Sequence, residues 1–95
     1  MSNQATGFSD IGLAGFVITV IYNGVPKPLP HVQPDEQVTA VFERALKLFD
    51  IRDRPHAYAL FTLAGQEIAN QQSVKHAGIV AGTELLLREK IVGGG

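Results

Sequence analysis

The chain has 95 residues, of which eight are basic, nine are acidic and 45% are hydrophobic. This length supports one domain with a modest core. The formal net charge of −1 argues against nucleic acid or an anionic membrane surface as a partner, because both attract clustered basic residues. The absence of cysteine excludes disulfides, a thiolate nucleophile and cysteine-ligated zinc, and it fits a reducing, cytoplasmic compartment.

Residues 1–15 are predicted to form a flexible N-terminal extension, because the first ten are mostly polar. No basic residue precedes Lys27, so we do not expect a secretory signal peptide, which begins with positive charge. The apolar residues 11–15 either stay mobile or adhere to another surface, and the usual behaviour of chain ends favours mobility. The apolar stretch 16–21 is too short to span a bilayer.

The domain itself is predicted to begin with a hairpin. Residues 16–22 are rich in β-branched and aromatic side chains, which is typical of a strand buried on at least one face. Asn23 and Gly24 both tolerate positive φ and indicate a tight turn. Residues 25–33 would form the returning strand. Its three prolines cannot donate ladder hydrogen bonds, so this strand is expected at a sheet edge.

Residues 34–37 indicate the start of a helix, with Asp35 or Gln37 near the N-cap. The apolar positions that follow repeat every three or four residues and form one stripe on an amphipathic helix: Val38, Val41, Phe42, Ala45, Leu46 and Phe49. A charged loop is expected over residues 50–56, where Pro55 limits further helix.

The last third of the chain is predicted to return to strands. We expect strands at residues 57–63, 66–69 and 83–89, with a single helical turn at 74–79. The order of strands and helix then suits a two-layer α+β domain over residues 16–90, in which one long helix packs across a mixed sheet. Residues 91–95 would form a flexible tail that ends in three glycines.

Three stretches resemble ubiquitin. Residues 32–35 resemble its Val-Glu-Pro-Ser before the helix, and residues 63–68 resemble its Phe-Ala-Gly-Lys-Gln-Leu turn. In the third stretch, four residues match core positions of ubiquitin: Val74, Ile79, Leu85 and Leu87. The same alignment then places Gly93 and Gly94, without a gap, on ubiquitin's terminal diglycine. The resemblance implies a ubiquitin-like β-grasp fold and is closest to bacterial ubiquitin-like modifiers. It needs about three extra residues in the loop before the third strand.

The resemblance also implies a function for the glycines. In that family an activating enzyme uses ATP to adenylate the terminal glycine carboxylate. The carboxylate then passes to enzyme cysteines as a thioester and is conjugated to a target. Gly93, Gly94 and Gly95 would be the conjugation tail, and Gly95, or Gly94 after trimming, would carry the reactive carboxylate. Residues without a Cβ allow close backbone approach in a narrow crevice. The alternative is that the glycines are a frayed end or a cloning scar.

The chain would therefore be a substrate rather than an enzyme, without a permanently bound cofactor. Its implied partners are an activating enzyme, a conjugating enzyme, a deconjugating peptidase and a target protein. Lys90 occupies a position where basic residues help ubiquitin dock on its activating enzyme. Ile91 and Val92 follow it, which favours a partly apolar partner groove. A plain solvated edge is the alternative reading of this segment.

Ubiquitin also recruits partners through an apolar patch on its sheet. The matching positions here are Thr62, Leu86 and Arg88, of which only Leu86 is apolar. Readers of ubiquitin are therefore expected to bind this face poorly. Exposed apolar patches do mark interaction sites, but the sequence does not locate one elsewhere.

No residue pattern indicates catalysis or a metal site. The three histidines, His31, His56 and His76, lack a metal-ligand spacing. Two further functions fit the same fold. A sulfur carrier would bear a C-terminal thiocarboxylate, and a non-conjugated binding module would not need its terminal glycines.

Overall fold

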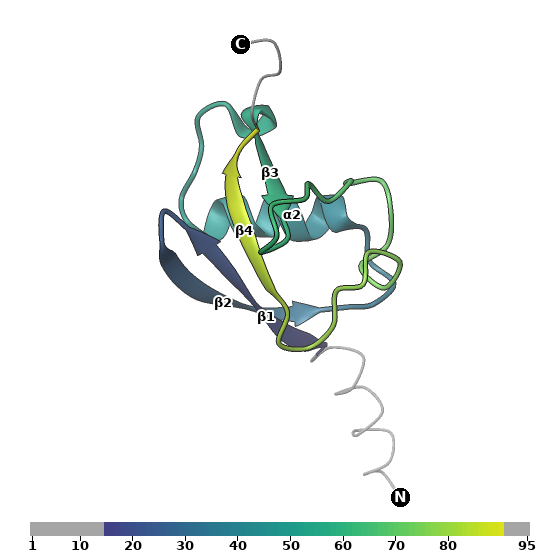
Figure 1. Ribbon diagram of the computed structural model, residues 1–95. Coiled ribbons are helices and arrows are strands. Elements are labelled where there is room, and N and C mark those ends of the chain that lie inside the picture. The colour runs from purple at the N-terminus through teal and green to yellow at the C-terminus, as the bar shows by residue number, and fades with distance from the viewer. Residues whose placement is uncertain (1–14, 91–95) are drawn as a thin grey trace, which may run out of the picture.

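The computed structural model describes residues 15–90 of the chain. In chain order, a hairpin, a helix, a short 3-10 turn and two further strands make up this part (Figure 1). Their bounds are β1 Phe16–Tyr22, β2 Val25–Val32, α2 Val38–Leu48, η1 Pro55–Ala57, β3 Tyr58–Phe61 and β4 Glu84–Glu89.

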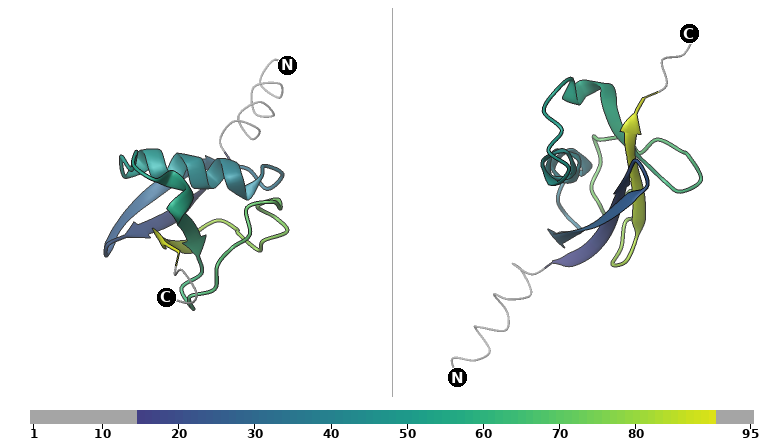
Figure 2. Two further views of the ribbon diagram at one scale, coloured as in Figure 1. Left: turned by 90° about the horizontal axis from the view of Figure 1, so that it is seen from above. Right: turned by 90° about the vertical axis from the view of Figure 1, so that its left-hand side faces the viewer.

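The four strands form one mixed sheet in the order β2-β1-β4-β3. β1 runs antiparallel to β2 and parallel to β4, and β3 runs antiparallel to β4. Figure 2 shows α2 lying across one face of this sheet. The predicted α+β architecture, with one helix packed on a mixed sheet, is confirmed.

The hairpin has the predicted turn. Asn23 and Gly24 have φ of 52° and 79°, the left-handed values that a two-residue turn between twisted strands requires. Such a turn makes Tyr22 and Val25 a hydrogen-bonded pair. Along the ladder, hydrogen-bonded pairs then alternate with pairs that share no hydrogen bond. Pro26 and Pro28 fall at the other positions, where no ladder hydrogen bond is lost, and Pro30 lies in the irregularity where the register shifts between Leu29 and Val32. β2 is an edge strand, as its prolines predicted.

The core lies between α2 and the inner face of the sheet. Along β1 and β4 the inward residues alternate with outward ones, which is the period of a strand with one covered face. The stripe predicted on the helix is confirmed for five residues, which are Val38, Val41, Phe42, Ala45 and Leu46, all buried. Phe49 lies just after the helix and packs partly buried against the same core.

The start of α2 is capped by another segment. Gln37 is the N-cap residue, but its side chain makes no capping hydrogen bond. The N–H groups of Val38 and Thr39 instead donate to the carbonyls of Gln72 and Asn70, at 2.8 and 3.2 Å. Residues 70–72 therefore satisfy backbone donors that a helix start leaves open. Asp35 lies before the helix and not in its first turn.

The third strand is shorter than predicted. It was expected over residues 57–63, but β3 begins at Tyr58, after η1, and ends at Phe61. Thr62 begins a turn, in which its carbonyl accepts the N–H of Gly65 at 2.9 Å and its hydroxyl accepts the N–H of Gln66 at 3.2 Å. Local bonds of this kind compete with a ladder, which explains why the strand stops there.

One further prediction for the last third is corrected. The strand expected over 66–69 is a single bridge between Phe61 and Glu67. The single helical turn expected at 74–79 is present as a hydrogen-bonded turn, in which the N–H of Ala77 donates to the carbonyl of Ser73 at 3.0 Å. The last strand, expected over 83–89, is confirmed as β4, which starts one residue later.

Candidate functional site at the carboxyl end of β4

The end of β4 is anchored as far as Lys90. The N–H of Lys90 donates to the carbonyl of Ala57 at 2.8 Å, and Arg54 forms an ion pair with Glu89 at 2.9 Å. The side chain of Lys90 is exposed. The other residues expected to contact an activating enzyme or to be conjugated lie outside the described residues; these are Ile91, Val92, Gly93, Gly94 and Gly95.

The outer face of the sheet, turned away from α2, carries an apolar row. Leu86 lies between Ile21 of β1 and Phe61 of β3 in the pairing register, and Ile21 in turn pairs with Pro26 of β2. Paired residues point to the same face, so this apolar row crosses all four strands. Leu86 and Ile21 remain partly exposed.

Arg88 covers one end of the apolar row. Its guanidinium carbon lies 4.3 Å from the centre of the Phe61 ring, a cation–π contact. Phe61 is only 5% exposed, although it lies on the outer face. The stem and head of Arg88 thus occupy the surface that the ring would otherwise present.

The structure brings Leu86 and Arg88 together on one face of β4 and does not add Thr62 to them. Thr62 lies in the turn after β3, and Phe61 is the residue opposite Leu86. Phe61 was not predicted, because the resemblance to ubiquitin assigned this position of the patch to Thr62. Phe61 is identified by the antiparallel register between β3 and β4. The sequence alone does not reveal that register.

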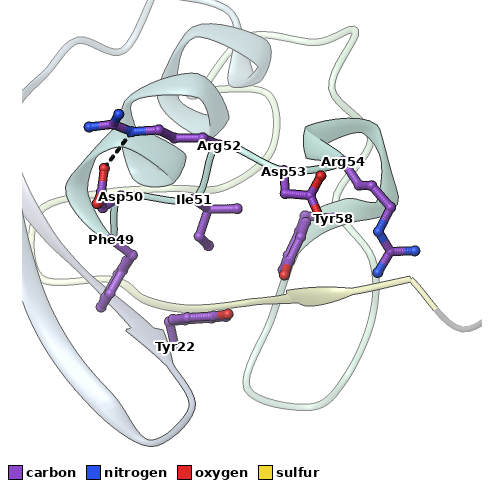
Figure 3. A pocket seen from close by; sticks show the side chains of 8 residues that line it. All are labelled: Tyr22, Phe49, Asp50, Ile51, Arg52, Asp53, Arg54 and Tyr58. Atoms are coloured by element: carbon purple, nitrogen blue, oxygen red, sulfur yellow. Dashed lines mark hydrogen bonds and ion pairs between the residues drawn. The ribbon is translucent and has the colours of Figure 1, made fainter.

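A pocket of about 270 Å³ opens near the end of β4, between the loop after α2 and the ends of β1 and β3 (Figure 3). Three aromatic rings line it. The ring centre of Tyr22 lies 5.4 Å from that of Phe49 and 6.2 Å from that of Tyr58. These separations and the tilted ring planes are typical of favourable aromatic pairs. We call this space the aromatic pocket.

Hydrogen bonding with the Tyr22 side chain raises the pKa of Tyr58, and burial raises it further. Both effects favour the neutral phenol. A second pocket, of about 290 Å³, borders the same pair and is also lined by Asn23, Arg88 and Glu89.

Within residues 15–90, His, Asp and Glu side chains form no group of three that could hold a metal ion. The same part of the chain contains no helix with both the length and the hydrophobicity needed to cross a membrane.

No protein-family model and no curated protein sequence matches this chain. Many solved structures do. Ubiquitin of Caldiarchaeum subterraneum is 22% identical with a TM-score of 0.66, covering 84% of this chain and 99% of that one. The ubiquitin-like domain of EccD5 from Mycobacterium xenopi is 15% identical with a TM-score of 0.67, covering 82% and 97%. The UBL domain of Plasmodium falciparum Dsk2 is 16% identical with a TM-score of 0.68, covering 80% and 99%.

These likenesses define the class of protein by its fold. The sheet order β2-β1-β4-β3 with a single helix is the ubiquitin-like β-grasp arrangement, and the chain has that fold. The structural neighbours include ubiquitin itself and ubiquitin-like domains of other proteins. At these identities the likeness establishes the fold, and function has to be argued from the site.

Proposed function

We propose that this chain is a ubiquitin-like protein modifier of the bacterial type that acts in the cytoplasm. An activating enzyme would adenylate the carboxylate that ends the glycine run, with ATP as co-reactant and pyrophosphate as leaving group. A cysteine thiolate would then displace AMP to form a thioester. A nucleophile on the target, such as an amine, would finally displace the thiolate. The chain's role is that of a substrate, and a deconjugating peptidase would reverse the last step.

The main support is the position of the last anchored residue. Lys90 is held to Ala57 at the end of the sheet, and Ile91 and Val92 separate it from Gly93–Gly95 in sequence. Five extended residues reach about 17 Å, which suffices to enter an enzyme crevice while the folded domain stays outside. Glycines permit close approach of the enzyme backbone and leave the acyl carbon unhindered.

The residues around this point suggest how the activating enzyme is recognised. Arg88 and Lys90 are exposed on the last strand and just beyond it. Ile91 and Val92 would add apolar contact. A partner groove that is acidic at its entrance and apolar further in would complement this order, and opposite charges at the entrance would speed association.

A second candidate function is that of a non-conjugated interaction domain. The exposed part of the apolar row, which consists of Pro26, Ile21 and Leu86 on three neighbouring strands, favours it, because contiguous apolar surface on a small domain marks contact sites. Such a domain would bind its partner through the sheet face and would not need the terminal glycines.

The test is to incubate the full chain with a candidate activating enzyme, ATP and Mg²⁺, and to measure intact masses. We expect a thioester to the enzyme that reducing agent cleaves, and then a stable adduct on a target protein. Deleting Gly94 and Gly95 should abolish both products, whereas Gly7→Ala, a glycine change at the other end of the chain, should leave them unchanged.

Other products would replace the proposal. Exchange of one terminal oxygen for sulfur would identify a sulfur carrier. A chain that forms no covalent product, and keeps its biological role without Gly94 and Gly95, would be an interaction domain.

A further inference from the structure

The aromatic pocket is sized for one side chain. Its volume of about 270 Å³ lies below the roughly 300–1,000 Å³ of sites that bury a drug-sized ligand or cofactor. Tyr22, Phe49, Ile51 and Tyr58 line it, and they come from the end of β1, the loop after α2 and the start of β3. The pocket is thus a fixed corner of the fold rather than a gap in one loop.

Some of the charged residues around the aromatic pocket form ion pairs and one does not. Arg52 is bound to Asp50 at 2.8 Å, and Arg54 is bound to Glu89 at 2.9 Å. Figure 3 shows both guanidinium groups directed away from the rings of Tyr22 and Phe49. Asp53 also lines the pocket, but it belongs to none of the ion pairs among the described residues.

The aromatic rings favour a cation beside that carboxylate. The face of an aromatic ring is negative and attracts ammonium and guanidinium groups. The chain itself uses this property from another side, where the Lys27 ammonium lies 5.1 Å from the centre of the Phe49 ring. A carboxylate next to ring faces is the combination that holds a positively charged head on an apolar stem.

We propose that the aromatic pocket binds the cationic side chain of an arginine or lysine from a partner protein, whose stem packs on Tyr22 and Tyr58 and whose head pairs with Asp53. The carboxylate and the hydroxyl of the tyrosine pair supply acceptors for the donors of that head. An arginine suits the site better than a lysine, because a planar guanidinium stacks on rings and is more weakly hydrated.

The loop that carries Asp53 is held in an unusual backbone conformation. Asp50 and Arg54 bracket it with φ of 57° and 52°, values that non-glycine residues rarely adopt, and Pro55 follows with a fixed φ. Backbone of this kind persists where surrounding contacts impose it, and it is concentrated at binding sites. The conformation therefore presents Asp53 in a defined place before any partner arrives.

The pocket lies beside the point from which the glycine run continues. Arg54 joins the pocket to Glu89, the last residue of β4, and Lys90 follows directly. The inference rests on the proposed function only for the identity of the partner, which would be the enzyme that receives the tail. A basic residue of that enzyme, seated here, would fix the domain while the tail enters the active site.

The experiment uses the full chain, labelled with ¹⁵N, in a titration followed by amide chemical shifts. The probe is a blocked Gly-Arg-Gly peptide, and the neutral control is the matching Gly-Gln-Gly peptide. We expect the arginine peptide to shift Tyr22, Phe49, Asp53 and Tyr58 specifically. Asp53→Asn should weaken binding about fivefold, the size of one partly exposed ion pair.

The matched control variant is Asp35→Asn. It removes the same charge from an exposed aspartate that lines neither pocket and belongs to none of the ion pairs among the described residues, so it should leave the affinity unchanged. Both acids are exposed, so neither change should unfold the protein. Equal effects of the two variants, equal binding of both peptides, or shifts centred on other acidic residues would each overturn the inference.

The titration contains no enzyme, no ATP and no chemistry at the glycines, so its result is independent of the conjugation assay. If the peptide causes no chemical-shift changes but conjugation succeeds, only the proposed binding role of the pocket is rejected. Specific binding beside failed conjugation would reject the modifier function and retain the pocket.

Discussion

The three consecutive leucines of β4 should contribute very differently to stability. Leu85 is 1% exposed and belongs to the core, whereas its neighbour Leu86 is on the outer face and partly exposed. Leu85→Ala removes buried methyl groups and leaves a cavity, which costs about 2–5 kcal/mol. Leu86→Ala loses only part of the transfer free energy and opens no closed cavity, so we expect about 1 kcal/mol.

The difference is measurable by urea unfolding. With a slope of about 1–2 kcal/mol per molar urea, a gap of about 2 kcal/mol separates the two midpoints by about 1–2 M. A small domain has only about 5–10 kcal/mol of stability, so the loss in Leu85→Ala could unfold the protein. A milder substitution at the same position is therefore measured beside it. Leu85→Met and Leu86→Met conserve volume and should each cost less than about 1.5 kcal/mol.

The outcome bears on the position of the tail. A shift of β4 by one residue would exchange Leu85 and Leu86 between the two faces and would move Lys90 along the sheet. If the two alanine variants unfold at the same urea concentration with unchanged slopes, or if Leu86→Ala costs more, the register described here is wrong.

Two more changes test the structure away from β4. Tyr22→Phe removes the hydrogen bond that raises the pKa of Tyr58, so the pKa of Tyr58 should fall toward the ordinary value of about 10. The bond's contribution to stability is present below pH 10 or so and is lost as pH rises through the raised pKa, and ultraviolet titration of the one remaining tyrosine reads the change directly. Gly15→Ala should lower the melting temperature more than Gly24→Ala. Both glycines have positive φ, but a Cβ on Gly15 would lie 2.5 Å from a backbone oxygen whereas one on Gly24 would meet open space; equal losses would contradict the close approach.

The parts of the fold that the sequence predicted are those set by short-range patterns. The bounds of β1, the Asn23-Gly24 turn and the apolar stripe of α2 all follow from spacing and from the φ preferences of a few residues. The edge position of β2 follows from its prolines, because a residue without an N–H cannot donate a ladder hydrogen bond in any context.

The parts that could not be predicted depend on contacts between distant segments. The cap on α2 comes from residues 70–72, whose carbonyls a sequence pattern cannot assign to Val38 and Thr39. The end of β3 depends on how the Thr62 hydroxyl bonds within its own turn. The register between β3 and β4 is likewise a long-range feature, and it places Phe61, and not Thr62, opposite Leu86 on the outer face.

The aromatic pocket could not be predicted either, because it also depends on contacts between distant segments. Tyr22, Phe49 and Tyr58 each read as ordinary packing residues, and only the fold brings their rings together. The loop between them carries left-handed Asp50 and Arg54, neither of which is glycine. Nothing in the composition of that loop marks the conformation, because it is imposed by the elements on either side.

Both edges of the sheet discourage the addition of a strand from another protein. At β2, the outward positions of the ladder hold prolines, which lack the donors that a new strand would need. At β3, the carbonyl of Leu60 already accepts the N–H of Ile68 at 2.9 Å, and Glu67 bridges Phe61. Partners that extend a sheet rely on those free backbone groups. The sheet edges therefore favour partners that bind side chains instead, as proposed for the apolar row, the aromatic pocket and the residues after Lys90.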